Sequence, residues 1–261
     1  MHLSKLDSPE FVLSTLQPAS PHSPSHMPYV PRARYCIFRG MWAELPENTH
    51  RKGPTNERVY ESEMLTFTTD ARMQKVTQIF ATSAGHGGEQ SQGSSGGGGP
   101  VEAVFWIKEV MTQWRFKGEA YVVGPDIEGE GEESSGVKMV KSKLGERMRV
   151  VNEQKMGKWS WQREISAHFE NLSPGMRGSF KNPIPGSLVG VAPEDKRLAL
   201  GQKVMLPLEE DEVARGNFRV VVIRADEVEL LDLTEPDKAR RWRFTHDGDS
   251  LGQWKEEELW P

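Results

Sequence analysis

The apolar residues of this 261-residue chain come in short runs that are rich in β-branched and aromatic side chains. Runs of this kind are typical of β-strands. The segments between them lack the apolar periodicity needed to pack against a core. We therefore expect four loops or flexible insertions, at residues 18–28, 45–57, 83–100 (which contains the tract GSSGGGG) and 126–136, and a solvated lysine-rich stretch after the last.

The runs predict a sheet that is largely built from hairpins. NFRVVVIR and the following VELLDL favour two strands with a turn at residues 225–227. A second hairpin is expected near the C-terminus, turning at the Asp-Gly-Asp cluster of residues 247–249. The remaining strands are predicted at residues 11–16, 33–40, 64–69, 101–107 and 114–123, and the C-terminal pair at 242–244 and 254–260.

Two helices are expected, because apolar residues recur at helical spacing within residues 71–80 and again within residues 161–172. Many short strands with few helices are typical of a closed or half-closed antiparallel barrel with helices packed outside it. We therefore predict a mainly β (α+β) fold that forms one elaborated domain over residues 1–261.

The composition excludes several classes of function. A net charge of −5 argues against nucleic-acid binding, which normally requires a basic face. Cys36 is the single cysteine, so the chain has no internal disulfide or common cysteine-histidine metal site, and we expect Cys36 to be a small buried strand residue. No run of about eighteen apolar residues is present to span a membrane, and we expect a cytoplasmic protein with no bound metal.

Sequence motifs of the common enzyme classes are absent, including the glycine-rich phosphate loops, HExxH and GxSxG. A series of basic and hydroxyl residues is more informative. It starts with Arg34 and Arg39 on one predicted strand, continues with Thr68, Thr69 and Asp70 at the end of the next, and closes with Arg72, Gln74 and Lys75 at the start of a helix. Guanidinium groups, hydroxyls and helix N-terminal amides all bind phosphate, so the series predicts a phosphate cradle.

These segments resemble the pyridoxamine 5′-phosphate oxidase-like family, in its FMN-binding split-barrel branch. The resemblance rests on six motifs in order: FVLSTL, PRARYCIFRG, LTFTTDARMQKVTQI, TQWRFKGEAYVV, NFRVVVIRADEVELLDL, and RRWRF followed by WKEEELWP. It implies a split β-barrel, FMN as cofactor and a homodimer with the flavin site between two subunits.

Roles for individual residues follow from the same resemblance. Arg34 and Lys75 would engage the FMN phosphate, with Thr68 and Thr69 adding hydroxyl and backbone contacts. Arg39 would lie at the boundary between cofactor and substrate. Arg72 and Gln74, at the phosphate turn, would also contact the cofactor. Gln113 would hydrogen-bond the isoalloxazine ring, and Arg243 would approach the flavin. Because Arg34 and Arg39 are five positions apart, a regular strand points them to opposite faces, so different roles or a bulge are required.

This chain also departs from the family pattern. The family's oxidases carry Arg-x-His before the C-terminal arginine, where this chain has Ala239-Arg240-Arg241-Trp242. Met73 and Gln74 stand where the phosphate turn of the family has serine and arginine. A substrate phosphate, as in pyridoxine or pyridoxamine 5′-phosphate, would then fall to Arg39, Arg177, Ser179 and Arg241. No catalytic residue is predicted.

Three functions are compatible with these residues. The first is an FMN-dependent oxidoreductase that oxidises a small substrate. The second is a non-catalytic FMN-binding protein whose substrate pocket has degenerated, and the third is a nicotinamide-dependent flavin reductase. Taken singly, Arg34, Arg39 and Lys75 would be ordinary surface residues of strands and helices. Their order along the chain is what favours a flavin site.

Overall fold

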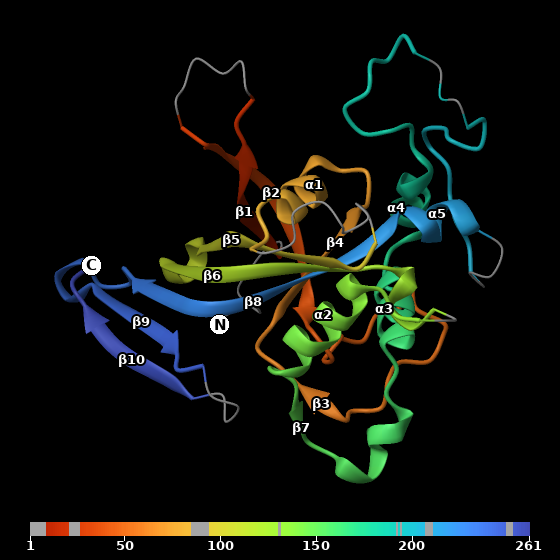
Figure 1. The fold of residues 1–261 in the computed structure, drawn as a ribbon. Helices are drawn as coiled ribbons and strands as arrows, with labels where there is room; N and C mark the ends of the chain where they lie inside the picture. The colour runs from red at the N-terminus through yellow and green to blue at the C-terminus, as the bar shows by residue number, and fades with distance from the viewer. Residues whose placement is uncertain are drawn as a thin grey trace.

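The computed structural model describes residues 9–20, 27–84, 94–129, 132–191, 193, 195–206, 211–248 and 253–261. Within them an antiparallel sheet has eight strands in the order β10-β9-β8-β4-β2-β1-β5-β6 (Figure 1). The strands are β1 (Glu10–Pro18), β2 (Tyr29–Met41), β4 (Leu65–Asp70), β5 (Gly96–Ile107), β6 (Thr112–Val123), β8 (Phe218–Asp232), β9 (Arg240–His246) and β10 (Trp254–Leu259). A separate small sheet pairs β3 (Tyr60–Glu61) with β7 (Arg149–Val150).

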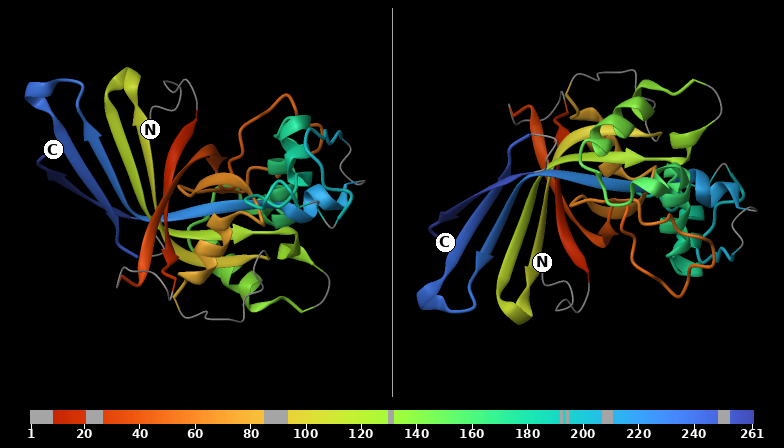
Figure 2. Two further views of the ribbon diagram at one scale, coloured as in Figure 1. Left: turned by 90° about the horizontal axis from the view of Figure 1, so that it is seen from above. Right: turned by 90° about the horizontal axis from the view of Figure 1, so that it is seen from below.

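The long strand β8 closes the sheet into a barrel. Its first residues pair with β4, and from Val220 onward it also pairs with β6, so β8, β4, β2, β1, β5 and β6 form a closed ring. From Glu227 onward, β9 replaces β4 as the second neighbour of β8. We call this second part the arm: β9, β10 and the paired ends of β6 (112–117) and β8 (227–232). The arm splays away from the helices (Figure 2), and the predicted mainly β split barrel is confirmed.

The predicted turn at residues 225–227 is wrong, because β8 runs through it without interruption. The pairing register with β6 shifts there, since Lys117 pairs with Glu227 whereas Gly118 pairs with Ala225, leaving Asp226 as the extra residue. A side chain at position 118 would lie 2.1 Å from the Arg224 carbonyl oxygen, so only glycine fits. The Ala-Asp-Glu sequence therefore marks a β-bulge rather than a turn.

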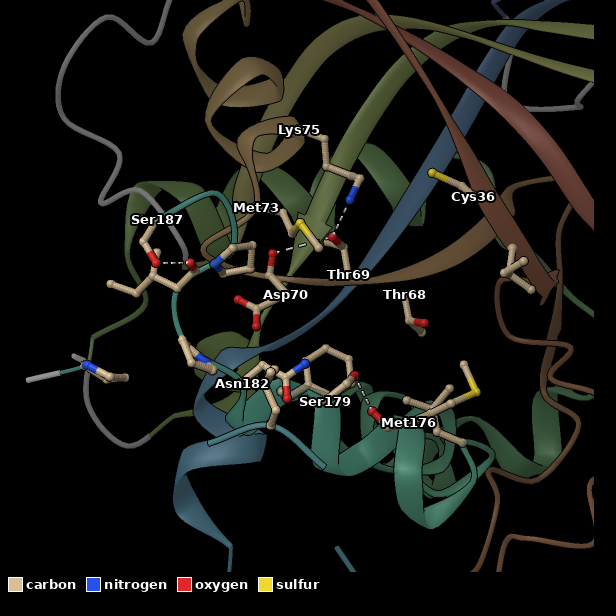
Figure 3. Close-up of a pocket in the computed structure, with 18 of the residues that line it drawn as sticks. Cys36, Thr68, Thr69, Asp70, Met73, Lys75, Met176, Ser179, Asn182 and Ser187 are labelled. Carbon is tan, nitrogen blue, oxygen red and sulfur yellow. Dashed lines mark hydrogen bonds between the residues drawn. The ribbon is translucent and has the colours of Figure 1, made fainter. Parts of the chain in front are cut away.

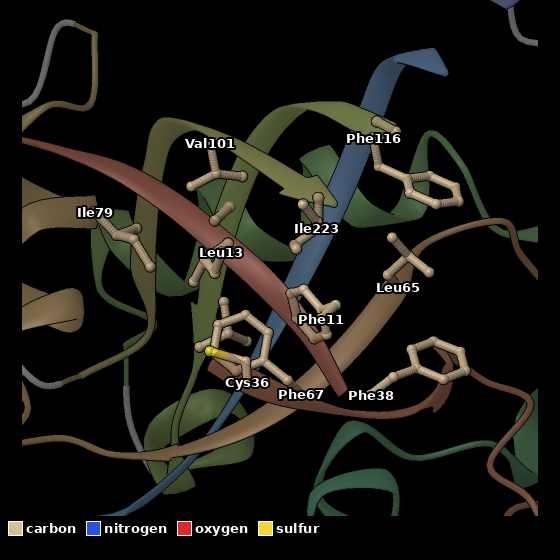
Figure 4. Close-up of a cluster of buried hydrophobic side chains, with 14 of the residues drawn as sticks. Phe11, Leu13, Cys36, Phe38, Leu65, Phe67, Ile79, Val101, Phe116 and Ile223 are labelled. Carbon is tan, nitrogen blue, oxygen red and sulfur yellow. The ribbon is translucent and has the colours of Figure 1, made fainter. Parts of the chain in front are cut away.

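Two hydrophobic clusters share the strands between them. One fills the barrel and includes Phe11, Phe67 and Phe105 (Figure 4). The other lies between the barrel wall and the helices and includes Trp42 and Phe169. Both faces of β8 are used, since residues 221 and 223 join the first cluster and residues 220 and 222 join the second. This explains why the β8 sequence is a continuous apolar run rather than an alternating one.

Five α-helices and several 3-10 helices occur in the described residues. The first expected helix begins later than predicted, at residue 74 instead of 71, and the second is confirmed at 161–170. The α-helices are α1 (Gln74–Ala81), α2 (Ser135–Gly145), α3 (Trp161–Glu170), α4 (Pro174–Gly178) and α5 (Glu212–Asn217). The 3-10 helices include η2 (Lys108–Val110), η3 (Pro125–Glu128), η4 (Glu153–Lys158), η5 (Ser179–Lys181) and η7 (Pro236–Lys238).

Parts of the predicted insertions are ordered structure. Residues 96–99 of the glycine tract form the start of β5. Position 99 requires glycine, because α1 packs so closely that a side chain there would lie 2.4 Å from the Ile79 carbonyl oxygen. The lysine-rich stretch after residue 136 is α2, which buries Val137, Val140 and Leu144 in the outer cluster. Residues 21–26, 85–93 and 130–131 of the predicted insertions lie outside the described residues.

The segment 45–57 has no regular structure, as expected, but it is bound to α3. The Gly53 amide donates to a Glu170 carboxylate oxygen at 2.6 Å, and the Asn56 side chain donates to Glu164 at 2.9 Å. No helix in the described residues is long and apolar enough to cross a membrane.

Candidate functional site

A cavity of about 730 Å³ opens between the barrel and the segment that follows α3. One side, which we call the strand wall, consists of residues of β2, the end of β4 and the start of α1. The opposite side, the loop wall, consists of Leu172, Met176 and the cavity-lining residues within 179–191, together with Pro193 and Leu200. Figure 3 shows Thr69, Asp70 and Lys75 on the first side and Met176, Ser179 and Asn182 on the second.

The alternation of β2 explains which of its residues reach the cavity. Tyr35, Ile37 and Arg39 share one face and line the cavity, whereas Arg34 lies on the other face. The strand has a bulge between Phe38 and Gly40, but it comes too late to bring Arg34 to the face of Arg39. The two arginines therefore have different environments, as their spacing predicts.

The end of β4 is fixed by a local turn. One Asp70 carboxylate oxygen accepts from the Arg72 backbone amide at 2.8 Å, and the other accepts from the Arg72 guanidinium at 2.6 Å. The chain then enters α1, whose N-cap residue Met73 makes no side-chain cap. The first turn of the helix thus places Lys75 beside Thr69, to whose hydroxyl its ammonium group donates at 3.1 Å.

Lys75 and Arg39 are cations without acidic partners. Within the described part of the chain, neither forms an ion pair, and the Arg39 Nε atom is buried with no hydrogen-bond partner. Burial lowers the pKa of Lys75, and burial likewise lowers the pKa of Arg39. Two partly desolvated positive charges therefore face one cavity, an arrangement that favours an anionic ligand.

Arg34 lies behind the strand wall, where it holds α1 against the barrel. Its guanidinium donates to the Thr15 hydroxyl at 2.6 Å and to the Gln78 side-chain oxygen at 2.7 Å. Arg34 is close enough to Lys75 to contribute to the lowering of its pKa, after the larger effect of burial. Cys36, on the same face of β2 as Arg34, also lines the cavity, and burial raises the pKa of its thiol.

The loop wall is held in place by Arg177, which is 2% exposed. Its guanidinium donates to the carbonyl oxygens of Glu170, Leu172 and Val204 at 3.1, 2.9 and 3.0 Å. These bonds tie α4 to the segments on both sides of it. The side chain is thus used inside the protein, and its contact with a substrate phosphate stays a prediction.

Arg72 joins the two walls of the cavity. Besides its ion pair with Asp70, its guanidinium donates to the carbonyl oxygen of Phe180 on the loop wall at 3.2 Å. The side-chain amide of Asn217 donates to the same carbonyl at 2.8 Å. Arg72 therefore sets the spacing of the walls instead of presenting a free charge to the cavity.

Three predicted site residues lie on the arm, far from the cavity. Thr69 pairs with Arg219 at the start of β8, whereas Gln113 pairs with Leu231 near its end. At the rise of a β-strand the distance along β8 between these positions is roughly 40 Å. Arg241 and Arg243 belong to the same end, where they pair with Glu229 at 2.5 Å and Glu257 at 2.9 Å.

Of the predicted residues, the cavity brings together Arg39, Thr68, Thr69, Lys75 and Ser179. Gln74 instead lines a separate small pocket with Gln17 and Gln78. Sequence reasoning missed Tyr35 and Ile37, although the period of two from Arg39 could have identified them. It also missed the apolar residues of the loop wall, which carry no periodic signal.

Comparison with known proteins agrees with this picture. Residues 2–124, which include β1 to β6 and α1, match the family model for the FMN-binding domain of pyridoxamine 5′-phosphate oxidase. No curated protein matches the sequence.

Two solved structures are similar. A pyridoxamine 5′-phosphate oxidase-related, FMN-binding protein from Nostoc punctiforme PCC 73102 is 18% identical, with a TM-score of 0.54 over 97% of this chain and 87% of that one. This likeness shows the fold. PhzG from Burkholderia lata 383, solved with tetrahydrophenazine-1-carboxylic acid, is 15% identical over 97% of this chain and 83% of that one, with a TM-score of 0.47. Over residues 2–124, just under half of its length, the chain is thus similar to the FMN-binding domain of pyridoxamine 5′-phosphate oxidase.

Proposed function

We propose that the strand wall binds the phosphate of FMN and that the protein is an FMN-dependent oxidoreductase acting on a small organic substrate. The observation that carries the proposal is the pair of cations, Arg39 and Lys75, that face one cavity without an acidic partner in the described residues. The match of residues 2–124 to an FMN-binding domain makes FMN the phosphate ligand to test first.

The residues of the strand wall fit a phosphate monoester. Such a group carries between about −1.5 and −2 charges at neutral pH, which two cations balance. The hydroxyls of Thr68 and Thr69 line the same part of the cavity and supply neutral donors. The amides of the first turn of α1 add partial positive charge, since the N-cap residue Met73 offers them no side-chain acceptor.

The protein's own residues would bind and orient the reactants. Bound FMN would supply the redox chemistry by taking up a hydride equivalent from the substrate. Lys75 and Arg39 would hold the phosphate end, and the loop wall would exclude water from the other side of the cavity. No cavity-lining side chain is assigned an acid or base role.

We further propose that a second copy of the chain completes the site. Within one copy, Gln113 and Arg243 lie roughly 40 Å along β8 from the strand wall, too far to share one flavin with Lys75. Beside the arm, Trp106 of β5 is 44% exposed and pairs with Gln113 in the sheet. A homodimer that places the arm of one copy at the cavity of the other would bring Gln113 and Arg243 to the predicted cofactor residues that line the cavity.

The test is a titration of the ligand-free protein with FMN, followed by flavin fluorescence. Lys75→Ala and Arg39→Ala should each weaken binding by about 10- to 100-fold, because each removes a charge-assisted contact. Lys138→Ala is the matched control, since Lys138 is an exposed lysine of α2 that pairs with Glu132. Equal affinities in all four proteins would refute the phosphate site.

The oxidoreductase assignment needs its own measurement. The FMN-loaded protein should turn over a small organic donor with reduction of its flavin under anaerobic conditions. A flavin that stays oxidised with every donor would identify a carrier of FMN, whereas reduction by NADH or NADPH alone would identify a flavin reductase. Sedimentation of the loaded protein tests the homodimer.

A further inference from the structure

We infer that the substrate of this cavity is an apolar, unphosphorylated molecule that binds against the loop wall. The inference rests on the proposed FMN site and names the substrate class for it. It departs from pyridoxine or pyridoxamine 5′-phosphate, the substrates that the family resemblance suggests.

The cavity holds few positive charges for anionic ligands. Among the described residues that line the cavity, the basic side chains are Arg39 and Lys75. One phosphate monoester, with its charge of between about −1.5 and −2, uses both. With FMN bound, the cavity has no cation left for a second phosphate, and a buried phosphate without cations is strongly disfavoured.

Four other basic residues in or near the segment of the loop wall already have partners, whereas Lys196 and Lys203 of the same segment are exposed and do not line the cavity. Arg177 holds three backbone carbonyls, and Arg72 pairs with Asp70. Lys181 pairs with Asp211 at 2.8 Å, and Arg197 pairs with Asp195 at 2.9 Å. None is free to leave its partner for a substrate at low cost.

The arm would not supply the missing charge if a second copy brought it to the cavity. Arg241 and Arg115 both face Glu229, and Arg243 faces Glu257. Each acid lies on the strand next to its arginine, so a second copy would bring both charges of a pair to the cavity. The arm therefore offers polar contacts with little net charge.

The loop wall is rich in apolar side chains. It presents exposed apolar side chains to the cavity, among them Leu188 (78% exposed), Val189 (103%) and Leu200 (77%). Exposed apolar residues gathered on one side of a concave site are characteristic of binding surfaces for apolar ligands. Figure 3 shows Ser179 and Asn182 of the loop wall opposite Thr69 and Lys75.

The two walls also differ in their relation to the family. The strand wall lies within residues 2–124, the region that matches the FMN-binding domain, whereas Leu172 and residues 179–200 lie outside it. The part of the cavity assigned to the cofactor is thus the part that the family shares. The apolar part is supplied by a region that the family model does not describe.

The experiment compares two probes that share one ring system, 2-naphthol and 2-naphthyl phosphate. The FMN-loaded protein is titrated with each, and the flavin absorbance spectrum reports binding. We expect 2-naphthol to bind at least about tenfold more tightly, because the phosphate would lie in a cavity without a free cation. Equal binding, or tighter binding of 2-naphthyl phosphate, would overturn the inference.

A variant places the probe on the loop wall. Leu188→Asp should weaken 2-naphthol binding by about tenfold and by a larger factor than it weakens FMN binding, because Leu188 belongs to the apolar loop wall and not to the pair of cations. Val151→Asp is the matched control, an exposed valine (44%) that does not line the cavity. If Leu188→Asp instead disrupts a dimer and leaves 2-naphthol binding intact, the loop wall is a subunit interface and the inference is wrong.

The two proposals fail in different ways. Loss of the FMN site would appear as an absence of flavin binding, before either probe is added. A protein that binds FMN tightly but shows no preference for 2-naphthol would keep the proposed function and lose only the substrate class.

Discussion

The strand wall and the arm both carry basic residues, but only the arm balances them with acids. On the arm, Arg241 and Arg243 each face an acid on the neighbouring strand. On the strand wall, Lys75 and Arg39 have no acidic partner within the described residues, and the Arg39 Nε atom is buried without a hydrogen bond. The same residue types thus have opposite electrostatic states in the two regions.

This difference separates structural cations from ligand-binding ones. A cross-strand ion pair at the surface contributes little and attracts no ligand strongly, because its charges cancel. A desolvated cation without a partner destabilises the ligand-free protein and is stabilised when an anion binds. Whether a charged side chain has a partner depends on tertiary structure. It therefore indicates function better than the presence of the charged residue in the sequence does.

The largest expected effect comes from giving the strand wall an acid, as the arm has. Thr69→Asp would place a carboxylate beside the Lys75 ammonium group, which now lies 3.1 Å from the Thr69 hydroxyl. The new ion pair would cancel one of the two cations and repel phosphate. We expect FMN affinity to fall by about 100-fold, as measured by fluorescence titration.

The control for this change is Thr69→Val, which removes the hydroxyl without adding charge. It should weaken FMN binding only by about fivefold, the effect of one neutral hydrogen bond. If the two variants bind FMN equally well, the charge of the strand wall is not what holds the ligand, and the contrast with the arm loses its functional meaning.

Much of the fold was predictable because it depends on local pattern. The runs with β-branched and aromatic residues became β1, β2, β4, β5 and β6. The errors fall where a second segment decides the structure. The turn expected at residues 225–227 is a bulge opposite Gly118, and the glycines of 96–99 form the start of β5 in close contact with α1. Neither neighbour can be read from the local sequence.

The candidate site divides in the same way. Thr68, Thr69 and Lys75 lie within one short segment, and their proximity follows from a strand that runs into a helix. The separation of Gln113 from them is set by the length of β8, and the internal use of Arg177 depends on carbonyls brought together by the fold. Sequence patterns cannot supply these facts, because they arise from tertiary contacts.

A smaller effect should appear in stability. Replacing Lys75 with Met removes a partly buried cation without a partner, so the FMN-free variant should be more stable by about 1 kcal/mol at neutral pH. Burial lowers the pKa of Lys75 in the native protein below its ordinary 10.5. Between the lowered pKa and 10.5, Lys75 is protonated in the unfolded chain but not in the native protein. The unmodified protein therefore gains stability as the pH rises through this window.

The advantage of Lys75→Met should accordingly be largest at neutral pH and shrink as the pH approaches 10.5. Urea unfolding at several pH values measures it. Lys117→Met on the arm is the matched control, because Lys117 pairs with Glu227 and is 66% exposed, and its effect should stay within about 0.5 kcal/mol. A destabilised Lys75→Met protein would show that Lys75 is a structural cation like those of the arm.

The smallest expected effect tests whether the arm reaches the flavin at all. Arg243 forms an ion pair with Glu257 at 2.9 Å. Its guanidinium can therefore contact a ligand only while Glu257 still balances part of its charge. Arg243→Ala should therefore weaken FMN binding only about threefold. Glu257→Gln should tighten binding by a similar factor, because it frees the guanidinium. These opposite shifts, measured by FMN titration, require the arm of a second copy at the cavity, since within one copy Arg243 lies far from Lys75. Two unchanged affinities would restrict the cofactor site to the strand wall.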